Sequence, residues 1–418
     1  MDASLDHGHH TASQASALNV RPENPRAAVR QYVGETLAAL VEQVCIPDGE
    51  GKPKITIKRR HTTAISSYRI NISTGALESD NAETEVTYIW PGKDAYEAWR
   101  FSITLRVLTA IAEAFDSGVV VSKRDIYYSD PAAFESQQVV DTLVDDLAYT
   151  IGVSRFDLNV EAAAKGLVTG FYQVTTTTGE RIDARLLTND CLIPRVQDIS
   201  RLDISDVDWV LILEKEAVFR RLTRSNFHIR ARAGMGLIVT VTLTSSFKPD
   251  MRVLTTQQGK GYPDLGTRSF VRKIYDSIPS SRSHNLPPIY ALVDSDPDGI
   301  AIMSTYKYGS MAHTRENSSL VIPSLRWLGL RTTDVVEDGE EALNGDDLMP
   351  LTPRDRKKIV AMLSRNPVLA VDGLEPEWRV ELQRMMMLNV KAETEIRYGR
   401  DGGLEGWIDR EMGRRASI

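Results

Sequence analysis

Two short apolar runs that each end in an acidic residue constrain the fold most. Trp209–Leu213 (WVLIL) runs into Glu214, and 290–293 (YALV) runs into Asp294, with Asp296 two residues further on. Strands without polar alternation are buried on both faces, as in parallel sheets covered by helices. Because the carboxyl ends of parallel strands meet at one edge of a sheet, the three carboxylates are expected to lie together. From about residue 200 onward the sequence therefore predicts an α/β domain.

Three neighbouring carboxylates repel one another unless a cation lies among them. No His or Cys accompanies Glu214, Asp294 and Asp296 in the sequence, and oxygen ligands alone select a hard cation, Mg²⁺ or Mn²⁺. For a single strand-end aspartate, the alternative is a helix cap or a surface turn. The combination of a glutamate after one strand and D-x-D after another favours a Mg²⁺ site, in which Mn²⁺ is able to substitute.

The segment before residue 190 is patterned differently. Apolar residues at helical spacing predict a helix from Asp94 to Phe115, and Ser122 is expected to cap a second helix that contains 123–128. A third helix is expected over 136–151, with Gly152 as its stop. Strand-like runs at 156–160 and 171–177 follow. Helix, turn, helix and hairpin, in that order, are typical of a winged helix-turn-helix (CAP-like) domain.

The N-terminal region reads as a tail and then a helix. Residues 1–24 show no periodicity and are expected to be disordered, without any feature of a secretion signal. Asn24-Pro25 marks a helix start, and an apolar stripe predicts a helix over 25–44 that either packs on its own domain or docks a partner. No apolar run approaches the roughly 18 residues of a spanning helix, so no membrane association is expected.

Composition and missing motifs exclude several kinds of site and activity. Two cysteines, Cys45 and Cys191, exclude a disulfide framework and a structural zinc site. The formal net charge is −7, so any nucleic-acid binding must rest on local basic segments. There is no P-loop and no G-x-S-x-G sequence, and therefore neither ATP hydrolysis by this chain nor serine-hydrolase chemistry is expected.

Tyr128 is the candidate nucleophile. Arg124 precedes it by four residues, so on a helix the guanidinium and the phenol share one face. Most tyrosines are half-buried packing residues. In a chain that combines a predicted Mg²⁺ site with a DNA-binding type of fold, a phenol is also a suitable nucleophile for phosphoryl transfer.

These features occur together with a collinear set of motifs over residues 95–400. The motifs are KRDIYYSD around Tyr128, AAKGLV at 163–168, LILEKEAVFRRL at 211–222, GKGYPDLGTR at 259–268, LVDSDPDG at 292–299, YKYGS at 306–310, LTPRDRKK at 351–358 and WRVELQRMMMLNVKAETEI at 378–396. With them the chain resembles the A subunit of topoisomerase VI and its eukaryotic relatives, the meiotic double-strand-break transesterases. The polar N-terminal tail is more similar to the eukaryotic branch.

The resemblance implies roles for individual residues. Tyr128 matches the family's nucleophile, and Arg124 would contact the scissile phosphate. Glu214, Asp294 and Asp296 match the Mg²⁺-binding acids of the Toprim domain. The positions that fall in the family's DNA groove are Lys165, Lys260, Tyr262 and Arg354.

The resemblance also implies an architecture and a setting. Residues 25–190 would form a partner-docking helix and a winged-helix domain, and residues 200–418 a Rossmann-like, parallel-sheet Toprim domain. The active form would be a homodimer on double-stranded DNA, with a transducer-like B-type subunit docked on residues 25–44. It would be nuclear and associated with chromosomes.

Three functions remain open at this point. The first is a topoisomerase-like transesterase whose double-strand breaks initiate meiotic recombination. The second is the catalytic A subunit of a topoisomerase VI-type enzyme that cuts and rejoins DNA with an ATPase B subunit. The third is a catalytically silent DNA-binding scaffold, against which the intact Tyr128 and the three carboxylates speak.

One segment departs from the family pattern. Between EKEAVF and GKGYPD the chain has extra length at 224–256, where 230–244 alternate like a β-hairpin. We expect a surface excursion, with a translated intron as the alternative. An insertion that displaced the strand following Glu214 would disturb the metal site.

Overall fold

The computed structural model describes most of the chain. The described residues are 22–47, 50–60, 68–79, 83–160, 166–186, 191–241, 263–278, 286–311, 314–336, 348–400 and 402–416. Among these residues, no helix combines the length and the apolar character that crossing a membrane requires.

The chain divides into two compact units. Unit 1 comprises Met1–His61 and Ala82–Glu161, and unit 2 comprises Thr62–Asn81 and Ala162–Ile418. The division thus falls at residue 161, not in the 190–200 interval that the sequence suggested. Residues from 166 onward join unit 2 because they supply strands to its sheets.

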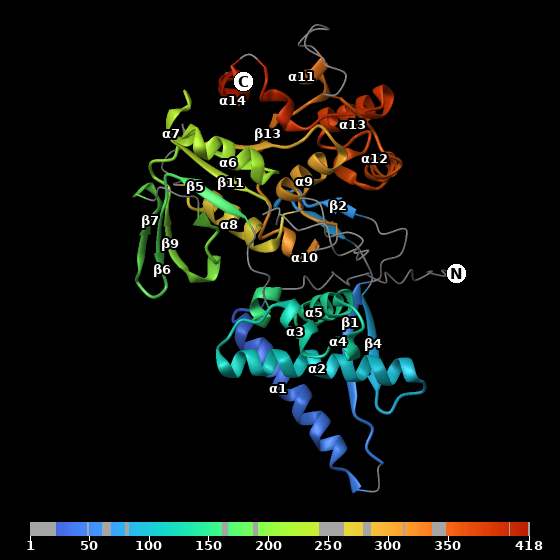
Figure 1. The fold of residues 1–418 in the computed structure, drawn as a ribbon. Coiled ribbons are helices and arrows are strands. Elements are labelled where there is room, and N and C mark those ends of the chain that lie inside the picture. Colours follow the sequence, from blue (N-terminus) through green and yellow to red (C-terminus); the bar gives the residue numbers. More distant parts are fainter. Residues whose placement is uncertain are drawn as a thin grey trace, which may run out of the picture. The chain divides into compact units, whose positions relative to one another are not determined.

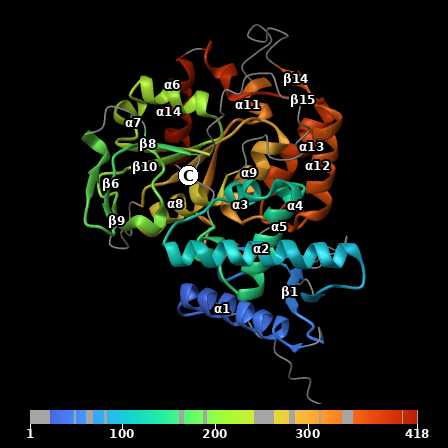
Figure 2. The same ribbon diagram turned by 60° about the horizontal axis from the view of Figure 1, so that its bottom comes forward.

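Unit 1 is mainly helical (Figures 1 and 2). Its elements are α1 (Pro25–Val44), β1 (Lys54–Arg60), β4 (Glu83–Ile89), α2 (Ala95–Ser117), α3 (Lys123–Ser129), α4 (Pro131–Phe134) and α5 (Gln137–Ile151). The predicted helix starts are confirmed: the side chains of Asn24, Asp94 and Ser122 each accept a hydrogen bond from a backbone N–H in the first turn. Gly152 ends α5 with φ 87°, in the left-handed region that favours glycine.

The core of unit 1 is formed where α2 and α5 pack against α1 and β1. Phe101, Leu108 and Ile111 of α2 are buried there, as the helical spacing predicted. On α1, Val29, Val33 and Leu40 are buried, while Val44 at its end is 71% exposed. The predicted stripe therefore packs on its own unit for most of its length and becomes exposed near its carboxyl end.

The prediction of a wing after the helices is wrong. Arg155–Leu158 is a short 3₁₀ helix, which a capping box between Ser154 and Asp157 stabilises. The strand expected at 171–177 exists as β6 (Gln173–Thr176), but it pairs with β7 and β9 inside unit 2. The antiparallel ribbon of unit 1 is instead β1 with β4, which lie between α1 and α2 in the chain and precede α3 and α5.

Unit 2 contains the predicted parallel sheet. Its strands run in the order β13 (Leu325–Gly329), β12 (Ile289–Leu292), β10 (Trp209–Leu213), β11 (Gly236–Thr240), β5 (Leu167–Gly170) and β8 (Cys191–Leu192). The pairs β13–β12, β12–β10 and β10–β11 are parallel, and β5 and β8 extend the sheet antiparallel. The smaller strands are β2 (Tyr68–Ile70), β3 (Leu77–Ser79), β6, β7 (Arg181–Asp183), β9 (Ile199–Asp203), β14 (Met349–Pro350) and β15 (Val390–Lys391).

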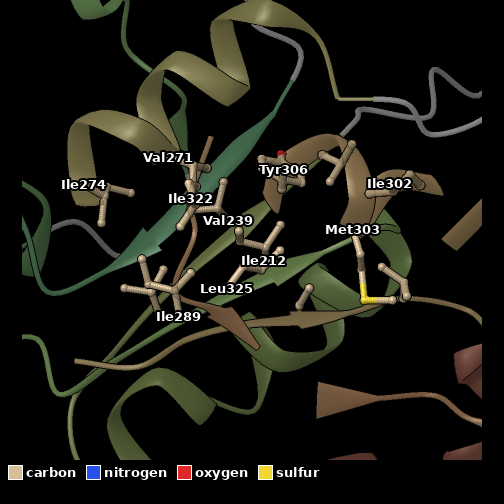
Figure 3. Packing of buried hydrophobic residues seen from close by; sticks show 14 of the residues in the cluster. Ile212, Val239, Val271, Ile274, Ile289, Ile302, Met303, Tyr306, Ile322 and Leu325 are labelled. Carbon is tan, nitrogen blue, oxygen red and sulfur yellow. The ribbon is translucent and has the colours of Figure 1, made fainter. Parts of the chain in front are cut away.

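Helices cover both faces of this sheet, which explains the unbroken apolar runs. Leu211 and Leu213 pack on one face with α6 (Glu216–Arg224) and α14 (Gly403–Ala416). Val210 and Ile212 pack on the other face with α8 (Leu265–Asp276) and α9 (Pro297–Lys307), and Figure 3 shows Ile212 among the side chains of this second cluster. Full burial of one such side chain contributes roughly 1.5–3 kcal/mol. The helices of unit 2 are α6 (Glu216–Arg224), α7 (Phe227–Arg230), α8 (Leu265–Asp276), α9 (Pro297–Lys307), α10 (Thr314–Asn317), α11 (Thr332–Val336), α12 (Pro353–Arg365), α13 (Pro376–Leu388) and α14 (Gly403–Ala416).

The expectation for the 224–256 segment is wrong in its described part. Gly236–Thr240 is neither a hairpin nor a surface excursion, because it forms β11, which is buried along its whole length and pairs in parallel with β10. The strand that follows Glu214 is therefore in place. Residues 242–262 lie outside the described residues.

Candidate active site

Glu214 and Asp294 lie together at the carboxyl edge of the sheet. Their strands, β10 and β12, are parallel neighbours in a register that aligns Leu213 with Leu292. The backbone N–H of Asp294 donates to Oε2 of Glu214 over 3.0 Å. The sequence therefore placed these two carboxylates correctly.

Asp296 is next to them and has a structural task as well. It is the N-cap of α9, where its Oδ1 accepts from the backbone N–H of Gly299 at 2.7 Å. Pro297 follows at the first helical position, a combination that starts helices firmly. In the same first turn, Asp298 forms an ion pair with Lys358 of α12. Capping and metal binding are compatible, since Oδ1 serves the cap and a carboxylate has a second oxygen.

Burial, reinforced by mutual repulsion, raises the pKa values of two acids at this edge. Burial, and then the charges of Asp294 and Asp296, hold the pKa of Glu214 well above its ordinary value. Burial raises the pKa of Asp296 to about 6, with Asp294 and Asp298 adding to the effect against the hydrogen bond from Gly299. Additional positive charge would stabilise the ionised form of these two acids, whose pKa values are raised.

Lys215 supplies part of that charge, and the sequence did not single it out. Its Nζ lies 3.0 Å from Oδ2 of Asp294, 2.8 Å from Glu393 and 2.9 Å from Glu395. Burial disfavours its charge, but the surrounding carboxylates outweigh this and raise the pKa of Lys215 above its ordinary value. Its position directly after Glu214 was the available signal, whereas Glu393 lies 178 residues further along the chain.

The loop that carries Glu393 and Glu395 is fixed against the Asp294 strand end. Ser295 and Ala392 exchange two backbone hydrogen bonds, of 2.9 and 3.1 Å. The backbone N–H and the hydroxyl of Thr394 both donate to Oδ1 of Asp294 at 2.9 Å. One oxygen of Asp294 is therefore held by Thr394, and the other faces Lys215.

The donor set fits Mg²⁺ chemically. Glu214, Asp294 and Asp296 offer only oxygen, and the raised pKa values of Glu214 and Asp296 indicate a deficit of positive charge. In the part of the chain that the structure describes, no three His, Cys, Asp or Glu side chains converge as a formed metal site. In this arrangement Asp294 contacts Lys215 and Thr394, and Asp296 caps α9 through the backbone N–H of Gly299.

In unit 1, Tyr128 and Arg124 lie on α3. The helix starts with a capping box, in which Ser122 and Asp125 bond to each other's backbone N–H at 3.0 and 2.8 Å. Ile126 is buried and anchors α3, so that Tyr128 is 61% exposed and Arg124 is exposed beside it. The Tyr127 ring packs partly against the core, with its centroid 5.2 Å from that of Tyr128. Tyr128 is therefore the more exposed of the two adjacent tyrosines.

Of the residues predicted to lie in a DNA groove, the structure describes one. Arg354 is exposed in the first turn of α12, next to the capping box of Thr352 and Asp355. Lys165, Lys260 and Tyr262 lie outside the described residues. Lys123, beside Arg124, is directed into unit 1, where its Nζ lies 3.0 Å from Asp145.

Two family models match parts of this chain. The family model for the Toprim domain of Spo11 and the topoisomerase 6 A subunit matches residues 242–399, and the model "Type IIB DNA topoisomerase" matches residues 99–160. The second match contains Arg124 and Tyr128, and the first contains Asp294 and Asp296. Glu214 lies between the two matched ranges.

Three relatives illustrate the similarity. The chain is 34% identical to the meiotic recombination protein SPO11 of Homo sapiens over 301 residues, which cover 71% of this chain and 67% of that one. It is 32% identical to the meiotic recombination protein rec12 of Schizosaccharomyces pombe over 376 residues, 88% and 91% of the two chains. It is 30% identical to the DNA topoisomerase 6 A subunit of Arabidopsis thaliana over 296 residues, which cover 70% of this chain and 61% of that one.

The fold and the matched segments define the class, a type IIB topoisomerase-like, DNA-cleaving enzyme with a Toprim domain. More particularly, the chain belongs to the family that comprises Spo11 and the topoisomerase 6 A subunit.

Proposed function

We propose that this chain is a DNA transesterase whose double-strand breaks initiate meiotic recombination, with Tyr128 as the nucleophile. The observation that carries the proposal is the placement of Tyr128 on α3. Tyr128 is exposed on a short helix that starts with a capping box, and it lies one turn from Arg124. Both residues fall within the segment that matches the type IIB topoisomerase model.

The reaction exchanges one phosphodiester for another. The Tyr128 Oη attacks a backbone phosphorus, the Oη–P bond forms, and the bond from phosphorus to the 3′ oxygen breaks. The phenolic proton is lost and the departing 3′ oxygen gains one, which leaves a 5′-phosphotyrosyl link and a free 3′-hydroxyl. Because a phosphodiester replaces a phosphodiester, no nucleotide hydrolysis is needed for cleavage.

The protein's own contribution is positioning and charge. Arg124 contacts the scissile phosphate and stabilises its developing charge, since it shares a helix face with Tyr128. Glu214, Asp294 and Asp296 would hold Mg²⁺, with Mn²⁺ as a substitute. When bound, the cation supplies positive charge near the phosphate. Exposed Arg354, together with Lys165, Lys260 and Tyr262, would hold the duplex through its backbone.

The architecture of unit 1 supports two further assignments. The antiparallel β1–β4 ribbon is tied to α5, where the backbone N–H of Lys58 donates to Oγ1 of Thr150 over 2.9 Å. We assign this ribbon, with α2, α3 and α5, to a winged-helix DNA-binding domain whose wing precedes its helices. On α1, the exposed Val41 and Val44 support docking of a transducer-like B-type subunit on residues 25–44.

The remaining parts of the proposal concern assembly and setting. Two protomers would act as a homodimer on double-stranded DNA, because one tyrosine breaks one strand. The relatives named as meiotic recombination proteins favour a nuclear, chromosome-associated role. The similarity to the DNA topoisomerase 6 A subunit supports a second candidate function. In that case the chain would be the catalytic subunit of an enzyme that rejoins its breaks with an ATPase B subunit.

The test is covalent capture in meiotic cells. The protein is immunoprecipitated under denaturing conditions, and attached DNA is labelled at its free 3′-hydroxyl. Tyr127→Phe is the matched control for Tyr128→Phe, because the two tyrosines are adjacent on one helix. We expect labelled DNA with the wild type and with Tyr127→Phe, and none with Tyr128→Phe. Label that survives in Tyr128→Phe would refute the nucleophile, and absence of label in wild type would favour a silent scaffold.

A further inference from the structure

The contacts of Lys215 join the metal-site candidate to a second acidic group. On one side, the ammonium faces Oδ2 of Asp294 at 3.0 Å; on the other, it faces Glu393 and Glu395 at 2.8 and 2.9 Å. Among the described residues, it is the one cation within ion-pair distance of Glu214, Asp294 or Asp296. The acidic edge of the sheet is therefore neutralised in part by a side chain of the same protein.

Lys215 and a divalent cation would compete for the same carboxylate oxygen. The other oxygen of Asp294 is held by two hydrogen bonds from Thr394, so Oδ2 is the oxygen that a metal ion would take. An ammonium 3.0 Å from that oxygen and a Mg²⁺ ion at its usual distance of about 2.0–2.1 Å would repel each other across a few ångströms, so each weakens the binding of the other to Oδ2.

Solvent exposure indicates where the displaced ammonium would go. The side chain of Asp294 is 7% exposed, that of Lys215 is 24% exposed, and those of Glu395 and Glu393 are 31% and 53% exposed. The two glutamates thus lie on the solvent side of Lys215. A lysine side chain is flexible enough to retreat toward them without movement of the backbone.

The backbone on both sides is fixed by secondary structure and hydrogen bonds. Lys215 is the N-cap residue of α6 and is separated from β10 only by Glu214, and the loop with Glu393 is bonded to Ser295 through Ala392. A rearrangement at this site would thus involve the ammonium and the exposed carboxylates, with the strand ends staying in place.

We propose that Lys215 is the resident counter-cation of the acidic site, and that its ammonium leaves Asp294 for Glu393 and Glu395 when a divalent cation binds. Lys215 is then a positioning residue that sets metal affinity: it keeps the site folded and compact without metal, and it weakens metal binding by occupying Asp294. The inference rests on the metal site of the proposed function.

The experiment measures Mn²⁺ affinity of the full chain, with free Mn²⁺ followed by its electron paramagnetic resonance signal. We expect Lys215→Met to lower the Kd for Mn²⁺ by at least about tenfold, because removing a unit charge a few ångströms from a divalent cation exceeds a tenfold effect. Damage to the fold would weaken binding, so a gain in affinity separates the proposed role from a structural one. Lys307→Met is the matched control, since that lysine lies at the other end of α9 and pairs with Glu375.

A second variant tests the retreat of the ammonium. Glu393→Gln should weaken Mn²⁺ binding in the wild-type background, because Lys215 loses a partner on the solvent side. In the Lys215→Met background the same change should have a clearly smaller effect. Equal effects in both backgrounds would mean that Glu393 acts only through its own charge, which would overturn the displacement.

The outcomes separate the inference from the function on which it rests. If wild type binds Mn²⁺ and Lys215→Met leaves the Kd unchanged or raises it, the inference fails and the metal site stands. The same conclusion follows if Lys307→Met tightens binding as much as Lys215→Met does. If neither wild type nor Lys215→Met binds Mn²⁺, the metal site itself fails, and with it that part of the proposed function.

Discussion

Replacing Asp355 by asparagine should cost about 2.5 kcal/mol of stability at neutral pH. Burial acts to raise the pKa of Asp355, but the Lys391 ammonium at 2.8 Å and the Thr352 capping contacts outweigh it and lower the pKa from 3.8 to about 2. A shift of nearly two pKa units corresponds to about 2.5 kcal/mol of folding free energy. Asparagine removes the charge and with it the charge-dependent part of both the Lys391 and the Thr352 contacts, whereas its amide oxygen still accepts a neutral capping hydrogen bond.

The sign of the pH dependence follows from the depressed pKa. A carboxylate with a lower pKa in the folded state stabilises the protein above its unfolded pKa, and this stabilisation is lost as pH falls toward the folded pKa. The difference between wild type and Asp355→Asn should hold from pH 7 to about pH 5 and fall to roughly half by about pH 3.

The assay is guanidinium unfolding followed by tryptophan fluorescence at pH 7, 5 and 3. Asp276→Asn is the control, because Asp276 pairs with Arg272 on the surface at 51% side-chain exposure and should cost well under about 1 kcal/mol. A difference for Asp355→Asn that is as small as the control at pH 7, or that is the same at pH 7 and pH 3, would refute the reasoning. The contact matters for the site because Lys391 begins the loop that carries Glu393.

Three further predictions concern α3, the sheet and the DNA contact. Ser122→Ala removes the α3 cap and should destabilise that helix by about 1 kcal/mol, seen as roughly fivefold faster amide hydrogen exchange in α3. Gly236→Ala would place a methyl group 2.1 Å from a tryptophan ring of β10 and should destabilise unit 2 by roughly 3 kcal/mol in thermal unfolding. Gly34→Ala on α1, where nothing lies within 4 Å, should instead stabilise by up to about 1 kcal/mol. Arg354→Ala should lower the slope of log affinity for duplex DNA against log salt by about 0.9, whereas Arg365→Ala at the far end of α12 should not change it.

Each of these has a result that speaks against it. Unchanged exchange in α3 would mean that the cap does not hold the nucleophile's helix. Normal stability of Gly236→Ala would contradict the close packing of β10 and β11. Equal salt slopes for the two arginine variants would remove Arg354 from the DNA contacts.

Local signals in the sequence were sufficient for most helices and for the parallel strands. Asn24 and Ser122 cap the helices they were expected to cap, and α2 starts at Asp94 as expected. The apolar run before Glu214 is a strand buried on both faces. These features depend on neighbours within one turn or on burial alone. Propensity and periodicity describe such neighbours directly.

The errors arose where pairing partners are distant in the chain. The run at 173–176 is a strand, but its pairing with β9 depends on residues about 25 positions away, so periodicity could not tell a wing from a sheet of unit 2. Residues 236–240 alternate weakly and were interpreted as a hairpin, whereas burial between β10 and β5 makes them an inner strand. Lys215 was missed for the same reason, because its partners Glu393 and Glu395 come from the other end of the domain.

The central claim, that Tyr128 becomes bonded to DNA, is tested most directly by locating the bond. Protein captured on DNA in meiotic cells is digested with nuclease and trypsin, and the peptide that contains residues 125–155 is fragmented by mass spectrometry. We predict a nucleotide attached through its 5′ phosphate to Tyr128, with Tyr127 unmodified. A nucleotide on Tyr127, or on a residue outside this peptide, would contradict the account.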